Sequence, residues 1–222
     1  MVARIPTSES LTGTVVRLDQ FTEADADELA ELLLDPRLHD EGFVMYVPPT
    51  ELDDAKELVW RRWAVTPDTD PNTRVTYAVR LVEDSSLGAK DTLVGVTSFG
   101  HIEPESEALH IGWTVWGRPW WGTAVNPEAK YLMLRAAFEA FGYGRVQLQT
   151  DRLNTRSQAA IAGLGATREG VLRRHMVRED GTFRDTVIFS ILADEWPDVK
   201  TRLEERLGRT NHPRPGLPVV GD

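Results

Sequence analysis

The spacing of apolar residues along the chain alternates between the period of a helix and that of a strand. In residues 126–141 apolar side chains recur every three or four positions, which predicts a helix with one continuous buried face. Asn126 suits the N-cap of this helix, Pro127 its first helical position, and Gly142 the left-handed residue that ends it. The run ALHIGWTVW (108–116), just before the helix, is typical of a buried strand.

The other predicted elements follow from the same patterns. Further strands are predicted at 14–18, 74–82, 92–100 and 145–151, with a hairpin of 170–178 and 183–192 around Asp180-Gly181. Further helices are predicted from Thr22 to about Asp35, from Thr50 through Trp63, at 154–165 and at about 194–207. Loops are expected at 1–10, 39–50, 66–72 and 101–107, and the Pro/Gly-rich tail 208–222 is expected to be disordered.

A strand, a short loop of small residues and the start of a helix follow one another at 108–128. Backbone N–H groups at a helix N-terminus have no partner within the helix, and the helix dipole favours negative charge there. This combination can therefore bind an anion. The phosphate loop GxxxxGK[ST] and the dinucleotide pattern GxGxxG are both absent, which counts against an unrelated ATP- or NAD-binding protein.

The loop and helix start read WWGTAVNPEA (120–129), which resembles the pyrophosphate loop [QR]xxGx[GA] of the GCN5-related N-acetyltransferases (GNAT). The segment is most similar to the branch that includes the ribosomal-protein N-terminal acetyltransferases, whose loops read like YWGxGxxxEA. Trp121 stands at the Gln/Arg position of the motif, Ala124 at its central Gly and Asn126 at its last position. These departures leave the backbone donors in place, because every residue except Pro provides an N–H.

Further segments resemble the same family in the same order. IGWTVW (111–116) is similar to its central strand, NTRSQAAIAGLGA (154–166) to its NxxSxxxIxxLGF segment, and residues 172–192 to the last two strands of the ribosomal branch. The order of predicted elements also matches from about residue 11 to 195. The resemblance implies an α/β fold with an α+β layered arrangement, in which helices flank a mixed, mostly antiparallel central sheet with splayed central strands. It also implies a single GNAT domain at 11–207.

The resemblance further implies that acetyl-CoA is the co-substrate. Its acyl-pantetheine arm would lie between the strands 108–116 and 145–151, and its pyrophosphate at the helix start. The residues assigned to acetyl-CoA are Trp113, Thr114 and Val115 for the arm, Trp121, Gly122, Thr123, Ala124, Val125 and Asn126 for the phosphates, and Asn154 and Ser157 on the opposite wall. Asn154 and Ser157 have a second interpretation, as the N-cap and N3 residues of the helix 154–165.

The implied reaction is acetyl transfer to a primary amine by direct attack in a ternary complex. It needs a base for the amine, donors for the developing oxyanion and an acid for the thiolate. His110 is the first candidate for the base and Glu107 the second; other candidates are His101, Glu103 and His175. A packed strand residue is the alternative interpretation of His110.

One position departs from the family in a way that bears on activity. Many GNAT members carry a tyrosine acid seven residues after the Asn, and Ile161 stands there in this chain. A side chain without a proton to donate cannot assist the leaving thiolate. A second function therefore stays open, a non-catalytic CoA-binding sensor or assembly module on the same fold.

The amino-acid composition limits the kinds of molecule that this protein is expected to bind. The chain has 222 residues, a net charge of −10 and no cysteine, which excludes disulfides, thiolate metal sites and a cysteine nucleophile. The acidic charge argues against nucleic acid, and no metal site is predicted. No run is long enough to span a membrane and residues 1–10 lack the apolar core of a signal peptide, so we expect a cytoplasmic protein. The expected acceptor is a small-molecule or peptide amine, and a homodimer is one of the oligomeric states that the sequence allows.

Negative charge is concentrated in residues 19–57, where thirteen Asp and Glu face only Arg37 and Lys56, a net charge of −11. Two interpretations of this acidic block stay open. It is either the solvated face of two helices or an acidic rim that attracts a cationic acceptor.

Overall fold

The structure is a computed structural model that describes residues 2–40, 45–64 and 74–208. Its strands are β1 (Leu11–Thr12), β2 (Val16–Gln20), β3 (Arg74–Leu81), β4 (Leu93–Glu103), β5 (Ala108–Trp116), β6 (Arg145–Asp151), β7 (Thr167–Val177) and β8 (Phe183–Leu192). Its helices are α1 (Glu23–Leu33), α2 (Arg37–Asp40), α3 (Leu52–Arg62), α4 (Val125–Arg135), α5 (Thr155–Ala162) and α6 (Trp196–Arg206), with the short 3₁₀ turns η1 (Pro104–Ser106) and η2 (Arg118–Trp120). A π-helical segment, η3 (Ala136–Ala140), continues α4.

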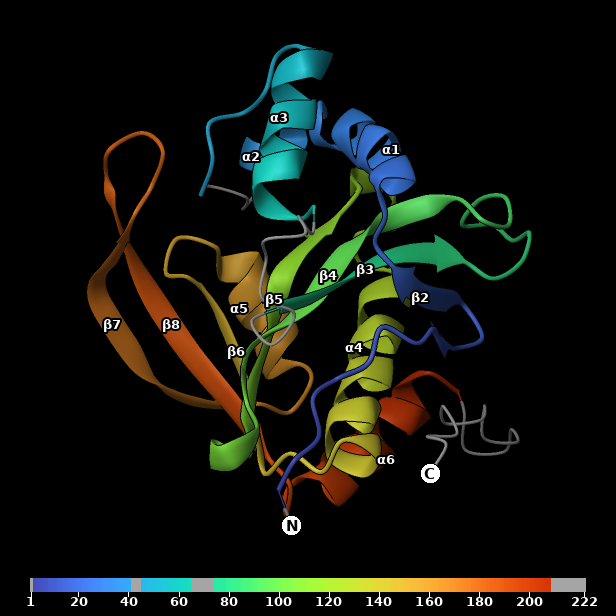
Figure 1. Cartoon of the computed structure of the whole chain (residues 1–222), viewed down its shortest axis with the longest axis vertical. Helices are drawn as coiled ribbons and strands as arrows, with labels where there is room; N and C mark the ends of the chain where they lie inside the picture. The colour runs from blue at the N-terminus through green and yellow to red at the C-terminus, as the bar shows by residue number, and fades with distance from the viewer. Residues whose placement is uncertain (1, 41–44, 65–73, 209–222) are drawn as a thin grey trace.

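The strands form one sheet in the order β1-β2-β3-β4-β5-β6-β8-β7 (Figure 1). Neighbouring strands are antiparallel, except for β5 and β6, which are parallel. These two pair only where Ala108–His110 faces Arg145–Gln147, and beyond this short ladder they diverge. The mixed sheet with splayed central strands that the sequence predicts is therefore confirmed.

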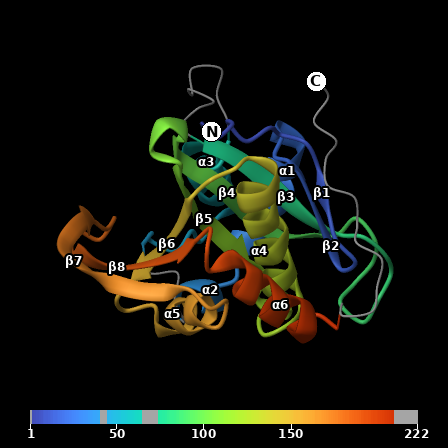
Figure 2. The same cartoon turned by 90° about the horizontal axis from the view of Figure 1, so that it is seen from below.

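Two hydrophobic cores fix the helices on the sheet. One lies between the sheet and α4, α5 and α6, and the other between the sheet and α1 and α3 (Figure 2). Alternate residues of the strands serve the two cores: Tyr77 and Val79 face the first, and Ala78 the second. Because helices cover both faces, the strands are mostly apolar rather than alternating. No helix within the described residues is long and apolar enough to cross a bilayer.

Most predicted elements are present, with differences at their ends. The loop predicted at 39–50 is shorter because α2 includes its first residues, and the loop predicted at 101–107 is shorter because β4 continues to Glu103. The loop predicted at 1–10 is anchored at two of its described residues: the Arg4 N–H donates to the Phe141 carbonyl and the Tyr77 hydroxyl to the Thr7 carbonyl. The turn predicted at 66–72, residues 41–44 and the tail from 209 on lie outside the described residues.

Helix α4 begins two residues earlier than predicted, so Pro127 is its third residue rather than its first. Ala124 occupies the N-cap position without a side-chain cap, so Asn126 lies inside the first turn and accepts a hydrogen bond from Trp116 Nε1 at 3.0 Å. The prediction of Asn126 as the N-cap is wrong because its amide oxygen already has this partner on β5. Gly142 has a φ of 75°, as its predicted role requires.

Glu128, on the first turn of α4, is fully buried and holds the start of the sheet. Its carboxylate accepts the backbone N–H groups of Thr14, Val15 and Val16 at distances of 3.0, 2.7 and 2.6 Å. A Cβ on Gly13 would lie 2.4 Å from a Glu128 oxygen, so the chain approaches the carboxylate as closely as only glycine allows. This contact locks the first turn of α4 in register with β2.

Candidate functional site

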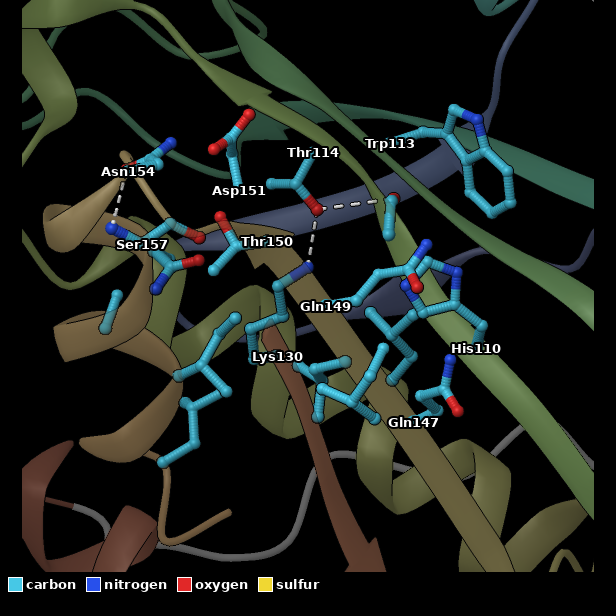
Figure 3. A pocket seen from close by; sticks show the side chains of 18 of the residues that line it. His110, Trp113, Thr114, Lys130, Gln147, Gln149, Thr150, Asp151, Asn154 and Ser157 are labelled. Carbon is cyan, nitrogen blue, oxygen red and sulfur yellow. Dashed lines mark hydrogen bonds between the residues drawn. The ribbon is translucent and has the colours of Figure 1, made fainter. Parts of the chain in front are cut away.

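A cavity of about 1430 Å³ opens where β5 and β6 diverge (Figure 3). Asn126 and Lys130 of α4 line it on one face of the sheet, and Tyr46 and Arg62 line it on the face covered by α3. The cavity therefore passes through the gap in the sheet and connects its two faces. Two molecules entering from opposite faces can meet in this gap.

The start of α4 presents unused backbone donors to this cavity. The N–H groups of Gly122, Ala124 and Asn126 have no hydrogen-bond partner in the described part of the chain, whereas Val125 N–H donates to the Thr123 hydroxyl at 3.3 Å. Gly122 has a φ of 74°, a conformation that favours glycine and turns the loop into the helix. These donors at the positive end of the α4 dipole form an anion site.

Two arginines bring positive charge beside the same loop. The guanidinium carbons of Arg118 and Arg156 lie 4.8 and 4.2 Å from the Trp121 ring centroid. The Trp121 indole N–H donates to the Trp116 carbonyl at 2.8 Å, which fixes the ring at the mouth of the loop. A tryptophan in place of the motif's Gln or Arg thus keeps cationic groups next to the anion site.

A β-bulge interrupts β5 at the gap. Val96 pairs with Val115 and Ser98 with Gly112, so Trp113 and Thr114 together oppose a single residue of β4. Trp113 has a φ of 48°, a strained conformation for a bulky residue. A second irregularity in β4, between Gly100 and Glu103, includes His101 with a φ of 45°.

The bulge changes which residues of β5 face α4 and which face α3. Thr114 accepts a hydrogen bond from Lys130 and therefore faces α4, whereas His110 packs against the Trp113 ring on the face of α3. Alternation along an uninterrupted strand predicts that His110 shares one face with Gly112, Thr114 and Trp116, and this prediction is wrong beyond Gly112. Residue spacing could not reveal this, because the prediction assumed an uninterrupted strand.

His110 is 3% exposed and lies in a cluster of three rings at the cavity. Its ring centroid is 5.6 Å from that of His101 and 5.2 Å from that of Trp113, and neither ring nitrogen has a hydrogen-bond partner among the described residues. Burial, with smaller contributions from His101 and Lys130, lowers the pKa of His110 to about 3. The imidazole is therefore neutral at neutral pH and lies at the cavity wall with both ring nitrogens buried.

The other candidate bases lie in different places. His101, Glu103 and His175 line the cavity, and His101 is exposed at its wall. Glu107 is not among the lining residues; its carbonyl accepts the N–H groups of Gly144 and Arg145 and so holds the β5–β6 junction closed. The structure thus brings His110 and the three other candidates to the cavity but not Glu107.

The backbone of β5 at the gap is partly occupied. The Trp113 carbonyl accepts from the Trp63 indole at 2.7 Å, and the Gly112 carbonyl from the Thr114 hydroxyl at 3.3 Å. Thr114 and Val115, like Trp113, line the cavity as predicted for the pantetheine arm. An added chain along β5 therefore meets a strand whose register is fixed by Trp63.

The opposite wall is formed by α5. The Asn154 side chain accepts the Ser157 N–H at 2.8 Å and caps the helix, in agreement with its structural interpretation. Asn154, Ser157 and the buried Ile161 all line the cavity. The cap and a role at the cavity are compatible, because the capping bond uses the amide oxygen, and the amide nitrogen is a separate donor group.

Lys130 is a cavity residue that the sequence pattern did not single out. Its ammonium donates to the Thr97 and Thr114 hydroxyls at 2.9 and 2.7 Å, and burial lowers its pKa to about 7 (Figure 3). The sequence did indicate that Lys130 is buried, because the apolar residues Tyr131, Leu134 and Phe138 lie outside the apolar stripe of the helix, on the side expected to be polar. A helix that is apolar all round is covered on every side, so a lysine within it is buried.

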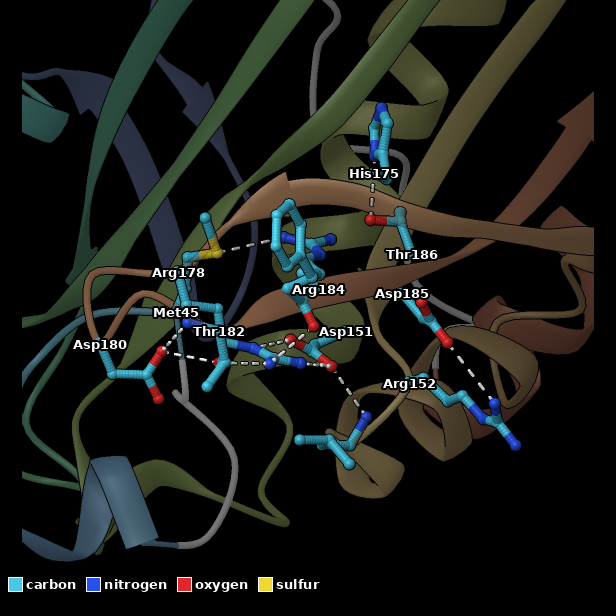
Figure 4. A network of polar contacts seen from close by, with 12 residues as sticks. Met45, Asp151, Arg152, His175, Arg178, Asp180, Thr182, Arg184, Asp185 and Thr186 are labelled. Carbon is cyan, nitrogen blue, oxygen red and sulfur yellow. Dashed lines mark hydrogen bonds and ion pairs between the residues drawn. The ribbon is translucent and has the colours of Figure 1, made fainter.

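The end of β6 is tied to the β7–β8 hairpin by a buried ion pair. Asp151 accepts from Arg178 Nε and Nη2 at 2.8 and 3.0 Å, and Arg178 also donates to Thr182 and the Phe183 carbonyl (Figure 4). This network holds one wall of the cavity in place. Within the described residues no group of His, Asp and Glu is arranged to hold a metal ion.

Comparisons with known proteins agree on one family. A model described as an acetyltransferase (GNAT) domain matches residues 16–167. A T. thermophilus protein described as an acetyltransferase is 35% identical, with a TM-score of 0.76 over 91% of this chain and 98% of its own. No curated protein sequence is significantly similar.

More distant solved structures share the fold. A GCN5-related N-acetyltransferase from Brucella melitensis is 24% identical, with a TM-score of 0.78 over 92% of this chain and 88% of its own. Mycobacterium smegmatis RimJ, solved with CoA-disulfide, is 20% identical, with a TM-score of 0.65 over 94% of each chain.

Proposed function

Because the chain belongs to the GNAT acetyltransferase family, we propose that it transfers an acetyl group from acetyl-CoA to a primary amine by direct attack in a ternary complex. The observation that carries this proposal is one cavity that joins unpaired N–H donors at the start of α4 to the gap between β5 and β6. The donors suit a pyrophosphate and the gap suits an extended arm, which together match the shape of an acyl-CoA.

Acetyl-CoA would be held from two sides. The N–H groups of Gly122, Ala124 and Asn126 would bind the pyrophosphate, with Arg118 and Arg156 supplying positive charge nearby. The pantetheine arm would follow Thr114 and Val115 of β5 into the gap, opposite α5. A backbone N–H at the β5 bulge would then stabilise the charge that develops on the acetyl oxygen.

Lys130 would protonate the leaving thiolate. In the reaction the amine nitrogen bonds to the acetyl carbon, the carbon–sulfur bond breaks, the amine loses one proton and the sulfur gains one. Lys130 lies at the gap with a pKa of about 7, so it is partly protonated at neutral pH and gives up its proton readily. It would replace the tyrosine that many family members carry at the position of Ile161.

His101 would take the proton of the amine. The pKa of His110 is too low for this residue to hold a proton at neutral pH, so His110 is better suited to accept a hydrogen bond from the amine and orient it. His101 is exposed, lines the cavity and lies 5.6 Å from His110 between ring centroids. It can pass the proton to water.

The test uses a variant that removes one backbone donor. Ala124 has a φ of −70°, which proline adopts without strain, so Ala124→Pro deletes its N–H and little else. We expect acetyl-CoA at a hundredfold excess over its Kd to stabilise the wild type by about 2.7 kcal/mol and to raise its melting temperature. Ala124→Pro should lose most of this shift and Ala124→Gly should keep it. Equal shifts in all three proteins would place the phosphates elsewhere.

The second candidate function is a CoA-binding module without catalysis. Ile161 favours it, because this cavity residue cannot donate a proton. A thiol-release assay over a panel of amines separates the two functions. Release of CoA thiol that depends on an added amine supports the transferase, whereas a CoA-dependent melting shift without thiol release supports the module.

A further inference from the structure

Two arginines that form no ion pair with any described residue line the α3 side of the cavity. Arg62 ends α3 and Arg184 lies on β8, and both are partly buried. The Nε of each has no hydrogen-bond partner among the described residues. A buried guanidinium without partners is costly, because its donors lose water and gain nothing in return.

The contacts that these arginines do make are weak. The Arg62 guanidinium lies 4.5 Å from the Tyr46 ring centroid, and Arg184 Nη1 approaches Met45 Sδ at 4.0 Å (Figure 4). Burial lowers the pKa of Arg184, partly offset by Asp151. Neither arginine forms an ion pair in the part of the chain that the structure describes.

A third arginine adds to the positive charge at this end. Arg74 begins β3 and stacks 5.3 Å from the Trp113 ring centroid. Burial lowers the pKa of Arg74, and Arg62 lowers it further. Arg62, Arg74 and Arg184 all lower the pKa of Tyr46, which burial raises. The three guanidinium groups therefore converge on one region beside Tyr46.

Two of the three described carboxylates that line the cavity are already engaged, and the third, Glu103, lies at the exposed end of β4. Asp151 is ion-paired with Arg178, and Glu169 with Arg145. Glu179 pairs with Arg61 and also accepts the Val47 N–H. The acidic block does not compensate either, because none of its described carboxylates lines the cavity.

We propose that the acceptor of this enzyme carries a carboxylate as well as its amine, and that Arg62 and Arg184 bind this carboxylate. The inference rests on the proposed function and names the substrate class of the same site. A guanidinium fork donates two parallel N–H bonds to a carboxylate, which is the partner that both unsatisfied Nε groups lack. A carboxylate held on the α3 side leaves the amine of the same molecule to face the three-ring cluster at the gap.

The test compares amines that differ only in the carboxylate. Thiol release is measured with two pairs of free amines, lysine against cadaverine and phenylalanine against phenethylamine. A third pair, the dipeptide amides Ser-Glu and Ser-Gln, tests whether the carboxylate is recognised in an acidic peptide rather than in a free amino acid. Because a hydrogen bond to a charged group contributes roughly 1.5–3 kcal/mol, we expect the carboxylate member to have a kcat/KM at least about tenfold higher. Arg62→Gln and Arg184→Gln should reduce this preference to less than about threefold, and Arg184→Lys should retain part of it.

Two matched controls exclude general effects. Arg61→Gln changes the neighbouring residue on α3, which is ion-paired with Glu179, and Arg152→Gln removes an exposed partner of Asp185 near Arg184. Both controls should keep the preference. Acetyl-CoA should shift the melting temperature equally in all five variants, since none of the substituted residues contacts the phosphate loop.

A second readout is independent of turnover. With CoA present, N-acetylphenylalanine should raise the melting temperature of the wild type more than its amide does, and Arg62→Gln or Arg184→Gln should abolish that difference. Equal shifts for acid and amide, or an equal or higher kcat/KM for the decarboxylated amines, would overturn the inference. An enzyme that acetylates only amines without a carboxylate refutes this inference but leaves the proposed function intact. Absence of thiol release from every amine refutes the proposed function, and the binding readout still decides the inference.

Discussion

Lys130 and His110 are buried bases that reach the cavity from opposite faces of the sheet. Each loses hydration on folding without gaining a carboxylate partner, and each therefore has a lowered pKa. Such groups reduce stability, which is tolerated where the chemistry requires them. Their cost makes both residues testable by stability as well as by rate.

Lys130→Met should stabilise the protein while slowing the reaction. The folded-state pKa of Lys130, about 7, is below the unfolded value of 10.5, so between these two values the unfolded chain binds more protons. Stability contributed by this group is therefore lost as pH falls from 10.5 to 7, by about 1.4 kcal/mol per pH unit. We expect Lys130→Met to flatten this slope, to raise the melting temperature at pH 7 and to lower kcat by ~10²-fold or more. An unchanged kcat would remove Lys130 from the reaction.

Variants of His101 and His110 should differ in the kinetic constant that they change. We expect His101→Gln to lower kcat by ~10²-fold, because the group that takes the proton is lost. His110→Gln should mainly raise KM for the acceptor. A larger kcat loss in His110→Gln than in His101→Gln would return the role of base to His110.

His110 should also affect stability at acid pH. Its folded-state pKa of about 3 lies below the unfolded value of 6.5, so stability is lost as pH falls through this interval. His110→Gln should therefore retain more of its pH 7 melting temperature at pH 4.5 than the wild type does. Melting curves across this range measure the difference.

At the scale of elements, the loop and helix that we propose to bind the phosphates depend on a contact far away in sequence. Glu128 joins α4 to the chain at Thr14–Val16 by accepting backbone N–H groups. Glu128→Ala would leave several buried donors without a partner, at a cost of about 1–3 kcal/mol for each group that water cannot reach. We expect a large fall in melting temperature, and a smaller fall for Glu128→Gln, which keeps one oxygen. In a domain of this size, a loss of about 1 kcal/mol lowers the melting temperature by roughly 2–4 °C. A melting temperature of Glu128→Ala within about 2 °C of the wild type would therefore show that the Glu128 contact does not stabilise the fold.

The helices and strands could be predicted from the sequence, but the irregularities within them and the contacts between them could not. Helix α4, strand β5 and the hairpin could be predicted, because their apolar periods are long and Gly142 and Asp180-Gly181 mark the helix end and the hairpin turn. Asn126-Pro127 gave the start of α4 only to within two residues. The bulge at Trp113 could not, because the register of one strand against another depends on tertiary contacts such as that of Trp63 with the Trp113 carbonyl. For Glu128, the sequence indicates only a favourable position near the positive end of the helix dipole, since its partners lie more than a hundred residues away.

The same division holds for the candidate site. The phosphate loop and the cap at Asn154 follow from local chemistry, and both were predicted. The arginines at 62 and 184 were not, because they come from a helix end and a strand that only the fold brings together. Their significance lies in missing partners, and a sequence cannot show which side chains remain unpaired.

For the whole molecule, the net charge of −10 conceals an uneven distribution. In the acidic block, Asp25 and Glu28 are ion-paired with Arg80, and Asp27 with Lys56. Paired and solvent-facing carboxylates have little long-range effect at physiological salt, where the Debye length is about 8 Å. The cavity meanwhile presents unpaired arginines, so the charge that an acceptor meets is opposite to that of the whole chain.

This opposition leads to a prediction about salt and charge reversal. Asp53 and Asp54 lie on the first turn of α3. Arg62, at the other end of this helix, lines the cavity, and the two aspartates do not. Reversing both to Lys should change kcat/KM for a carboxylate-bearing acceptor by less than about twofold. The reversal should also lower the stability of α3, by about 0.3–1 kcal/mol for each charge at the helix N-terminus. Raising ionic strength should lower kcat/KM for that acceptor in wild type and double variant alike, because salt screens the attraction to the arginines. If the double variant instead rejects cadaverine while the wild type accepts it, and salt weakens cadaverine turnover, then the acidic block attracts cationic acceptors and the arginines do not select the substrate.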